Sequence, residues 1–258
     1  MDADLCFASA TRLRRLIDTK EVSIVELTEL FYRRIQELNP RLNAYLALCP
    51  DQALATARAA QERVQHRRRG EALGPLHGIP ISIKDLETTK DIPTTVGSAV
   101  FRGRTPDMDS VVVERVRQAG AIILGKTNTP EFGLSGTTEN KLGDPCRNPW
   151  NPERTSGGSS GGAAAALASG LCTLATGSDG GGSIRIPASF SGVFGIKPSQ
   201  GRVPRYGGYG RPSANHFSGS GPMSRTVEDS ALLLQVLAGP DQRDPTCRRE
   251  PPPDFLAD

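Results

Sequence analysis

The sequence predicts an α/β protein with a mixed, mostly parallel central sheet that helices cover. A helical pattern over residues 107–119 runs directly into a short apolar segment at 121–124. Further short apolar segments lie on either side of this unit, at 79–83 and 171–175. Helices that alternate with short apolar strands are typical of right-handed crossovers between parallel strands.

The first 70 residues are predicted to form a helical packing layer. In order, the expected elements are a helix at 7–18, a helix at 23–39, a strand at 42–48 and an alanine-rich helix at 51–70. Ser23 and Glu26 form a capping box that opens the second helix, and Pro40 is expected to end it. Asp51 is expected to cap the alanine-rich helix, and Gly70 to end it.

Residues 71–238 are predicted to form the α/β core, so that 1–238 make one domain. The expected elements are strands at 78–85, 121–124, 171–175 and 193–196, with helices at 107–119, 163–168, 184–191 and after Thr226. Lys84 arrives at the C-terminal end of its strand, where α/β sheets place ligands and catalytic groups. Lys126, in the polar turn after the next strand, is a rival candidate. Taken alone, Lys84 is better interpreted as a surface residue just past a strand.

Residues 239–258 are rich in proline and charge, with three consecutive prolines at 251–253. This composition predicts a segment that is either disordered or a truncated connection.

Two glycine–serine clusters form the most informative stretch of the chain. The first is GGSSGG at 157–162, and the second is DGGGS at 179–183. Such loops suit a phosphate cradle, or an oxyanion hole beside a serine nucleophile. Neither cluster supplies the lysine of a P-loop. A flexible linker fits poorly because the residues between the clusters are apolar and structure-forming. Serine chemistry is therefore the leading interpretation.

The composition excludes several other classes. The net charge of +3 is too small to indicate nucleic-acid binding, and no apolar run is long enough to span a bilayer. Five scattered cysteines without CxxC spacing predict reduced thiols and a cytoplasmic protein. The three histidines, His66, His77 and His216, are each interpreted as structural or exposed, so a lysine base is expected instead.

With these motifs in hand, the chain resembles the amidase signature family. The resemblance joins GGSSGG, DGGGSIR at 179–185 and the lysine strand GIPISIKD at 78–85. It also includes GKTNTPEF at 125–132, NPW at 148–150 and GPMSRTVED at 221–229, and it runs from the first helix to Gly239. It implies an amidase signature fold and an amidase domain at 1–238.

The resemblance also implies a Ser–cis-Ser–Lys triad. By motif, the nucleophile is Ser183, the bridging serine is Ser159 and the base is Lys84. Backbone N–H groups of the turn would form the oxyanion hole, at Gly180, Gly181, Gly182 and Ser183 itself. Supporting roles fall to Ser160, Asp179 and Arg185. The implied activity is hydrolysis of a carboxylic amide to an acid and ammonia or an amine, through an acyl-enzyme on Ser183.

Three alternatives stand beside this interpretation. An α/β-hydrolase is rejected, because the GxSxG match at 158–162 has no strand before it. Family members are usually much longer, so the chain is also consistent with a catalytically silent fragment, a truncated reading frame or half of a split protein. An A-subunit-like component of glutamyl-tRNA amidotransferase is the third, although residues 129–133 look more like the general amidases.

The expected partner is a small-molecule amide, with no nucleic acid and no membrane. A homodimer is one oligomeric state that the sequence allows. No metal or organic cofactor is expected, because no cluster of His, Cys or carboxylate residues has metal-ligand spacing.

Overall fold

The computed structural model describes residues 2–68, 70–208 and 217–257, and its elements follow the predicted alternation. The helices are α1 (Asp2–Cys6), α2 (Ala10–Asp18), α3 (Ile24–Leu42), α4 (Pro50–Gln65), α5 (Val111–Gln118), α6 (Gly161–Ala168), α7 (Arg185–Ser191) and α8 (Val227–Leu237). The strands are β1 (Tyr45–Leu48), β2 (Pro80–Lys84), β3 (Ile122–Thr127), β4 (Leu174–Asp179), β5 (Phe194–Gly195) and β6 (Gly219–Ser224). Short 3-10 turns lie at Ala99–Phe101 and Glu131–Gly133.

The strands of the described residues form one mixed sheet in the order β1-β3-β2-β4-β6-β5. Its centre is parallel, because β2 pairs with β3 on one side and with β4 on the other. The outer strands β1, β6 and β5 pair antiparallel. The predicted α/β class with a mixed sheet is confirmed, and the parallel pairing lies in the three strands that surround the candidate site.

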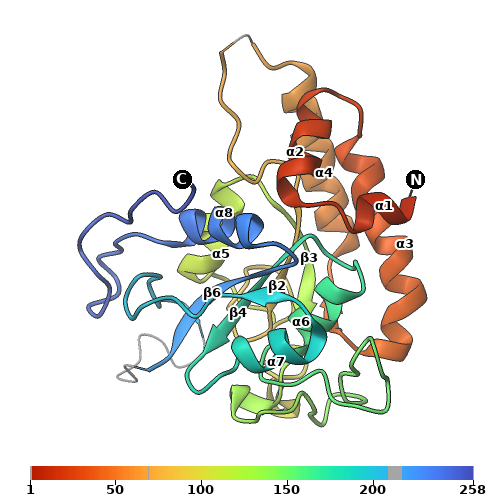
Figure 1. Ribbon diagram of the computed structural model, residues 1–258, viewed down its shortest axis with the longest axis vertical. Helices are drawn as coiled ribbons and strands as arrows, with labels where there is room; N and C mark the ends of the chain where they lie inside the picture. The colour runs from red at the N-terminus through yellow and green to blue at the C-terminus, as the bar shows by residue number, and fades with distance from the viewer. Residues whose placement is uncertain (1, 69, 209–216, 258) are drawn as a thin grey trace.

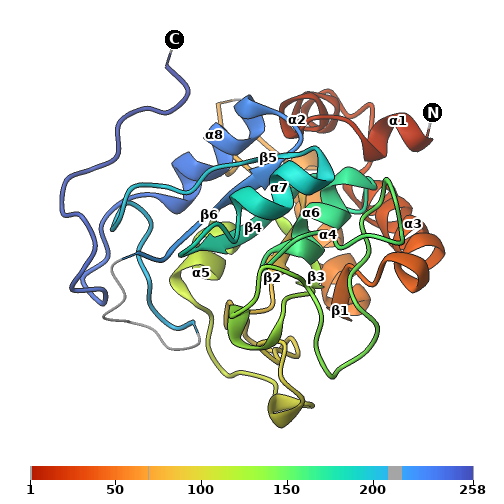
Figure 2. The ribbon, with the colours of Figure 1, turned by 60° about the horizontal axis from the view of Figure 1, so that its bottom comes forward.

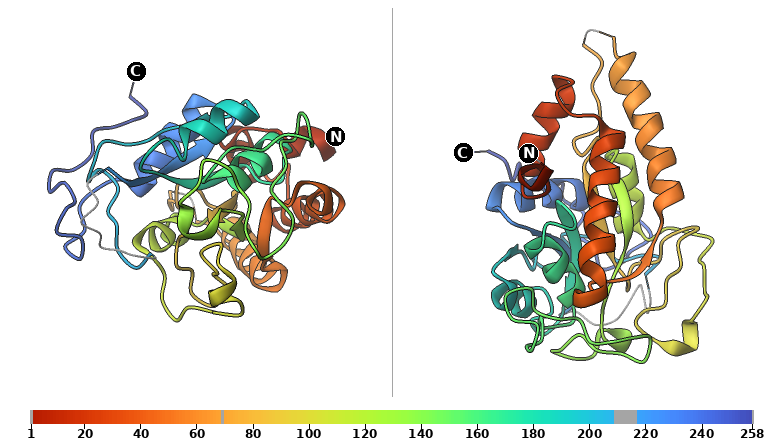
Figure 3. Two further views of the ribbon diagram at one scale, coloured as in Figure 1. Left: turned by 90° about the horizontal axis from the view of Figure 1, so that it is seen from below. Right: turned by 90° about the vertical axis from the view of Figure 1, so that its right-hand side faces the viewer.

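Helices cover both faces of this sheet. The crossover from β2 to β3 carries α5, and the crossover from β3 to β4 runs the opposite way across the sheet and carries α6. Right-handed connections therefore place α5 and α6 on opposite faces, and Figure 3 shows α5 and α7 on either side of the sheet. Helices α6 and α7 pack together, and α8 packs on β6 and α5. Figure 2 shows α6 and α7 above the central strands.

Helices α1 to α4 lie together at one side of the molecule, at the upper right of Figure 1. Helix α3 packs along α4, and α4 packs on β3. Ser23 caps α3 with a hydrogen bond from the Glu26 N–H, as the capping box predicts. The helix predicted at 7–18 begins at Ala10 as α2, because the Ser9 side chain accepts from the Arg12 N–H and caps it there, and the separate short helix α1 before it was not predicted.

Three further predicted helix boundaries were wrong, at the end of α3 and at both ends of α4. Helix α3 continues through Pro40 to Leu42, since proline near the C-terminus removes a single ladder bond and Asn43 closes the helix in the left-handed conformation at φ 49°. Helix α4 begins at Pro50, which occupies a first-turn position where its missing N–H costs nothing, and it ends at Gln65 rather than at Gly70.

Two further differences concern the core. Strand β3 extends to Thr127, so Lys126 lies inside the strand and not in a turn after it. Strand β6 was not predicted, because GSGPMS lacks the β-branched and aromatic residues that mark strands. Antiparallel pairing along all of β4 holds it in the sheet.

The segment after α8 has no helix or strand among residues 239–257. It is nevertheless tied to the body of the protein. The Gly239 N–H donates to Arg202 O, the Arg248 N–H donates to Gly201 O, and Phe255 packs against the core. The boundary at residue 238 stays a prediction.

Candidate active site

Lys84 ends strand β2 with its side chain fully buried. Its ammonium group donates to three hydroxyls, at 2.7 Å to Ser159 Oγ, 2.8 Å to Ser160 Oγ and 3.0 Å to Ser178 Oγ. The Ser178 carbonyl lies 3.4 Å from the same nitrogen. The contacts of Lys84 with serines 159 and 160 join the predicted lysine strand to the first glycine–serine cluster, 75 residues further on.

Ser159 lies in the loop that leads into α6, and the peptide bond between Gly158 and Ser159 is cis. The loop leaves no room for side chains at its glycines. A Cβ on Gly158 would lie 2.6 Å from Thr137 O, and one on Gly157, which has φ 81°, would lie 2.9 Å from Pro187 Cα. Glycine at both positions lets the backbone turn so that the Ser159 hydroxyl reaches Lys84.

Ser160 occupies the N-cap position of α6, yet its side chain makes no capping hydrogen bond. Its hydroxyl contacts Lys84 and the backbone of Ser178 instead. Its N–H donates to Ser183 O at 3.0 Å. This bond links the two glycine–serine clusters directly.

Asp179 organises the turn that carries Ser183. Its carboxylate accepts from the Gly182 N–H at 2.7 Å and from the Ile184 N–H at 3.1 Å, and it pairs with the Arg185 guanidinium at 2.9 Å. Burial acts to raise the pKa of Asp179, but the hydrogen bonds from Arg185 and these N–H groups outweigh it and lower the pKa to about 2. The turn is therefore built around a fixed negative charge.

Ser183 lies in this turn, half-buried, just before α7. Within the described residues, its hydroxyl has no hydrogen bond, and none joins it to Ser159 Oγ. The N–H groups of Gly180, Gly181 and Ser183 likewise have no acceptor inside the described chain, whereas the Gly182 N–H is taken by Asp179. The geometry thus leaves three of the four predicted oxyanion donors open.

The rival lysine, Lys126, lies elsewhere. It is fully buried on β3, donates to Glu87 O at 2.5 Å and Thr94 Oγ1 at 2.9 Å, and lies 3.7 Å from Asp85 Oδ1. Burial lowers the pKa of Lys126 to about 8 and raises the pKa of Asp85. No hydrogen bond in the described chain joins Lys126 to a serine. It holds the segment after β2 in place.

The sequence reasoning missed two residues of this cluster. Thr176 Oγ1 accepts from the Lys84 N–H at 3.0 Å, and Ser178 contacts the Lys84 side chain. Both lie on β4, two residues apart, so they share one face of the strand. Alternation of polar residues before DGGGS was the signal that could have found them.

The other candidates remain outside this cluster. His66 closes α4 at the surface, and His77 is buried with its Nε2 3.0 Å from Ala60 O, where burial lowers its pKa. His216 lies outside the described residues. The five cysteines are free. Residues 2–68, 70–208 and 217–257 contain no group of three metal-ligating side chains, and no helix in these ranges is long and apolar enough to cross a membrane.

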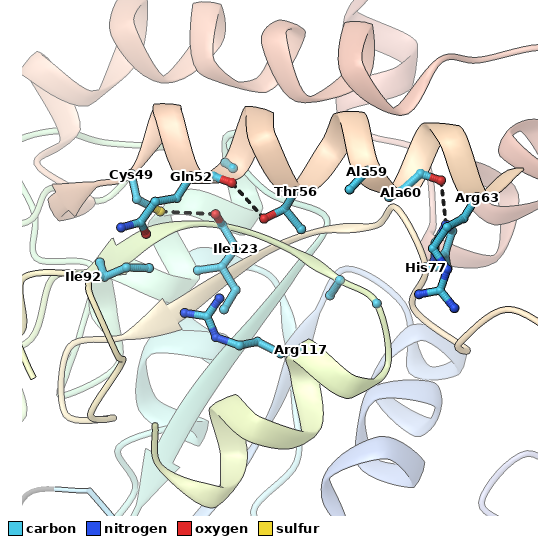
Figure 4. Close-up of a pocket in the computed structure, with 13 residues that line it drawn as sticks. Cys49, Gln52, Thr56, Ala59, Ala60, Arg63, His77, Ile92, Arg117 and Ile123 are labelled. Carbon is cyan, nitrogen blue, oxygen red and sulfur yellow. Dashed lines mark hydrogen bonds between the residues drawn. The ribbon is translucent and has the colours of Figure 1, made fainter. Parts of the chain in front are cut away.

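A pocket of about 200 Å³ lies between α4 and α5, over β3 (Figure 4). Alanines of α4 form much of its wall, with Cys49 at one end and His77 and Arg63 at the other. Cys49 Sγ donates to Ile123 O, and burial raises the pKa of this thiol to about 11. None of the Lys84 cluster lines this pocket.

The site thus joins a buried lysine, hydrogen-bonded to a serine of the first glycine–serine cluster, to a second serine in the glycine turn after β4. The Amidase family model matches residues 26–258, and the chain belongs to the amidase family.

The chain is similar to curated and solved members of this family. It is 44% identical over 253 residues to the A-subunit of the glutamyl-tRNA(Gln) amidotransferase of Anaeromyxobacter dehalogenans (strain 2CP-C), covering 98% of this chain and 50% of that protein. A bacterial aryl acylamidase of the amidase signature family is 38% identical with a TM-score of 0.88, over 97% of this chain and 51% of that one.

A third relative is a chain solved as part of a vestigial protein complex that bears on the origins of an s-triazine catabolic enzyme. It is 36% identical with a TM-score of 0.90, over 96% of this chain and 54% of that one. The chain spans about half the length of the curated relatives it matches.

Proposed function

We propose that the protein hydrolyses a carboxylic amide through an acyl-enzyme on Ser183. The observation that carries the proposal is the buried hydrogen bond of 2.7 Å between Lys84 Nζ and Ser159 Oγ, one residue from the Ser160 N–H that binds the carbonyl of Ser183. A base, a bridging hydroxyl and a nucleophile on adjacent segments are the parts that serine acyl transfer needs.

In the proposed first step, Ser183 Oγ bonds to the amide carbon while its proton passes to Ser159 Oγ, and the Ser159 proton passes to neutral Lys84. The C–N bond then breaks as Ser159 gives its proton to the leaving nitrogen and takes one back from protonated Lys84. Water attacks the acyl-enzyme by the same relay and releases the acid. Burial of Lys84 favours this scheme, because burial disfavours the charged form of an amine.

The negative charge that develops on the carbonyl oxygen needs N–H donors. We place these at Gly180, Gly181 and Ser183, whose N–H groups have no acceptor in the described chain. Gly182 is the least suited of the four predicted donors, because its N–H already donates to Asp179. Asp179 and Arg185 then act by shaping the turn.

The test is ammonia release from a panel of simple aliphatic and aromatic amides by the 258-residue chain. Ser183→Ala should lower turnover by roughly a thousandfold or more, because it removes the nucleophile. Ser189→Ala, at an exposed position on α7, is the matched control and should leave turnover unchanged. Equal turnover in Ser183→Ala would exclude Ser183 as the nucleophile. A folded chain without turnover would favour the catalytically silent alternative.

A second candidate is an A-subunit-like component of an amidotransferase. The 44% identity to a subunit of this kind favours it, over nearly the whole of this chain. In that case glutamine should be hydrolysed in preference to the rest of the panel, and partner subunits would be required for amide transfer. Comparison of kcat/KM for glutamine with that for aromatic amides separates the two candidates. A cytoplasmic location and a small-molecule amide substrate belong to both proposals.

A further inference from the structure

We infer that Ser160 and Ser178 are positioning residues that aim the lone pair of Lys84 at Ser159. The inference deepens the proposed function and rests on it. A neutral lysine amine has two N–H groups, which donate, and one lone pair, which accepts. Three hydroxyls lie within 3.0 Å of Lys84 Nζ, on Ser159, Ser160 and Ser178. Lys84 can accept a proton from only one of them at a time.

The bonds of Ser160 fix its role. A hydroxyl donates one hydrogen bond and accepts up to two. Ser160 Oγ lies 3.4 Å from the Ser178 carbonyl, to which it can only donate, and it accepts from the Ser178 N–H at 3.3 Å. Its remaining acceptor site faces Lys84 at 2.8 Å. Ser160 therefore receives one N–H of the amine and does not compete for its lone pair.

Ser178 offers the amine a second acceptor. Both its hydroxyl, at 3.0 Å, and its carbonyl, at 3.4 Å, lie within reach of Lys84 Nζ. The second N–H can therefore go to Ser178, which leaves the lone pair for Ser159, the nearest of the three hydroxyls at 2.7 Å.

The position of Ser160 in the fold supports this assignment. A serine at an N-cap ordinarily accepts from the N2 or N3 backbone N–H of its helix. Ser160 occupies the N-cap of α6 but makes no such bond, and its hydroxyl faces the β2 and β4 strand ends instead. The Ser160 hydroxyl therefore contacts Lys84 and does not cap α6.

The test is the rate at which a fluorophosphonate labels Ser183, measured from pH 6 to pH 11 on the 258-residue chain. Ser160→Ala and Ser178→Ala should each label roughly 10- to 100-fold more slowly at the plateau, a part of the about 100- to 10,000-fold that a positioned proton acceptor typically contributes. The midpoint of the pH profile should also move to lower pH, because a hydrogen bond from the ammonium form is stronger than one from the neutral amine, so that the loss of an acceptor disfavours the ammonium form more.

Two controls separate positioning from folding. Ser178→Thr keeps a hydroxyl at this position, and a strand accommodates β-branched residues. This variant should therefore recover most of the labelling rate that Ser178→Ala loses. Circular dichroism melting should show all variants folded at the assay temperature. The charged side chains on the segments around β2 are the same in every variant, so they do not account for a difference in midpoint between variants. These residues are Asp85, Glu87, Lys126 and Asp179.

Each outcome decides a separate question. Slower labelling with a shifted midpoint and recovery in Ser178→Thr supports the inference. Wild-type rates in both alanine variants overturn it, and so do slower rates with an unshifted midpoint, which would indicate a structural role. A folded wild-type chain that is not labelled at Ser183 contradicts the proposed function itself, and the inference falls with it.

Discussion

At the scale of single residues, the carboxylate of Asp179 holds the turn that carries Ser183. It accepts N–H groups from three positions of the turn and pairs with the largely exposed Arg185. Hydrogen bonds to the charged form lower the pKa of Asp179 to about 2 against the opposing effect of burial. The aspartate that begins the second glycine cluster is therefore a structural centre for its neighbours.

Asp179→Asn should lower the free energy of unfolding by about 2 kcal/mol at pH 7, the equivalent of a pKa that falls from 3.8 to about 2 on folding. Because the folded pKa is the lower one, this stabilisation is complete above pH 3.8 and disappears as the pH falls towards 2. Urea unfolding at pH 7, 4 and 2.5 measures it. Glu153→Gln, at an exposed carboxylate, is the control. A difference between Asp179→Asn and wild type that stays constant down to pH 2.5 would contradict this account.

At the scale of elements, α6 decides how closely the first glycine cluster approaches the sheet. All of its residues except Ala168 are buried. A Cβ on Gly162 would lie 2.5 Å from Ala44 O and 2.7 Å from Asn128 O, which are backbone atoms that cannot move aside. Glycine in the first turn therefore lets the helix lie against the ends of β1 and β3.

Gly162→Ala should destabilise the protein by about 1–3 kcal/mol through overpacking, even though alanine is the better helix former by about 1 kcal/mol. Chemical denaturation measures the change. Gly136→Ala is the matched control, because a Cβ there meets no atom within 4 Å, and it should be nearly neutral. If Gly162→Ala were as stable as the control, α6 would not be held by this close contact.

At the scale of the whole molecule, the two ends of the described domain are joined by polar contacts. Asp229, in the first turn of α8, accepts from the Ala10 N–H at 2.9 Å and so satisfies the start of α2. Arg225 donates to Ala8 O at 3.0 Å and to Cys172 O at 2.8 Å. The N-terminal layer and the core are thereby held as one unit.

Asp229→Ala should lower the free energy of unfolding by about 1.5–3 kcal/mol, the usual contribution of hydrogen bonds to a charged group. The m-value should stay at the wild-type value, because the domain still unfolds in one step. Glu228→Ala, its exposed neighbour, is the control and should change little. An early separate transition for the N-terminal helices in the wild type would show that the two ends are not coupled.

Much of the architecture could be predicted from local patterns. The Ser23 cap of α3 and the Thr226 cap of α8 are both present, because each needs only a side chain and an N–H three residues away. The central strands were also predicted, since apolar runs between turns are local signals. The boundary errors at Pro40 and Gly70 arose where neighbouring packing and backbone geometry outweighed local preference.

The sequence by itself determined the α/β class, the central strands and the residue types that meet at the site. Apolar periodicity and glycine clusters are properties of consecutive residues, so they can be recognised without the fold. Only the tertiary structure shows that both lysines are buried on central strands, and that Lys84 contacts serines 159 and 160 whereas Lys126 contacts Glu87 and Thr94. It also brought in Ser178 and assigned the Gly182 N–H to Asp179. These outcomes depend on which atoms lie within about 3 Å of one another, and strand pairing sets those distances across stretches of 75 residues or more.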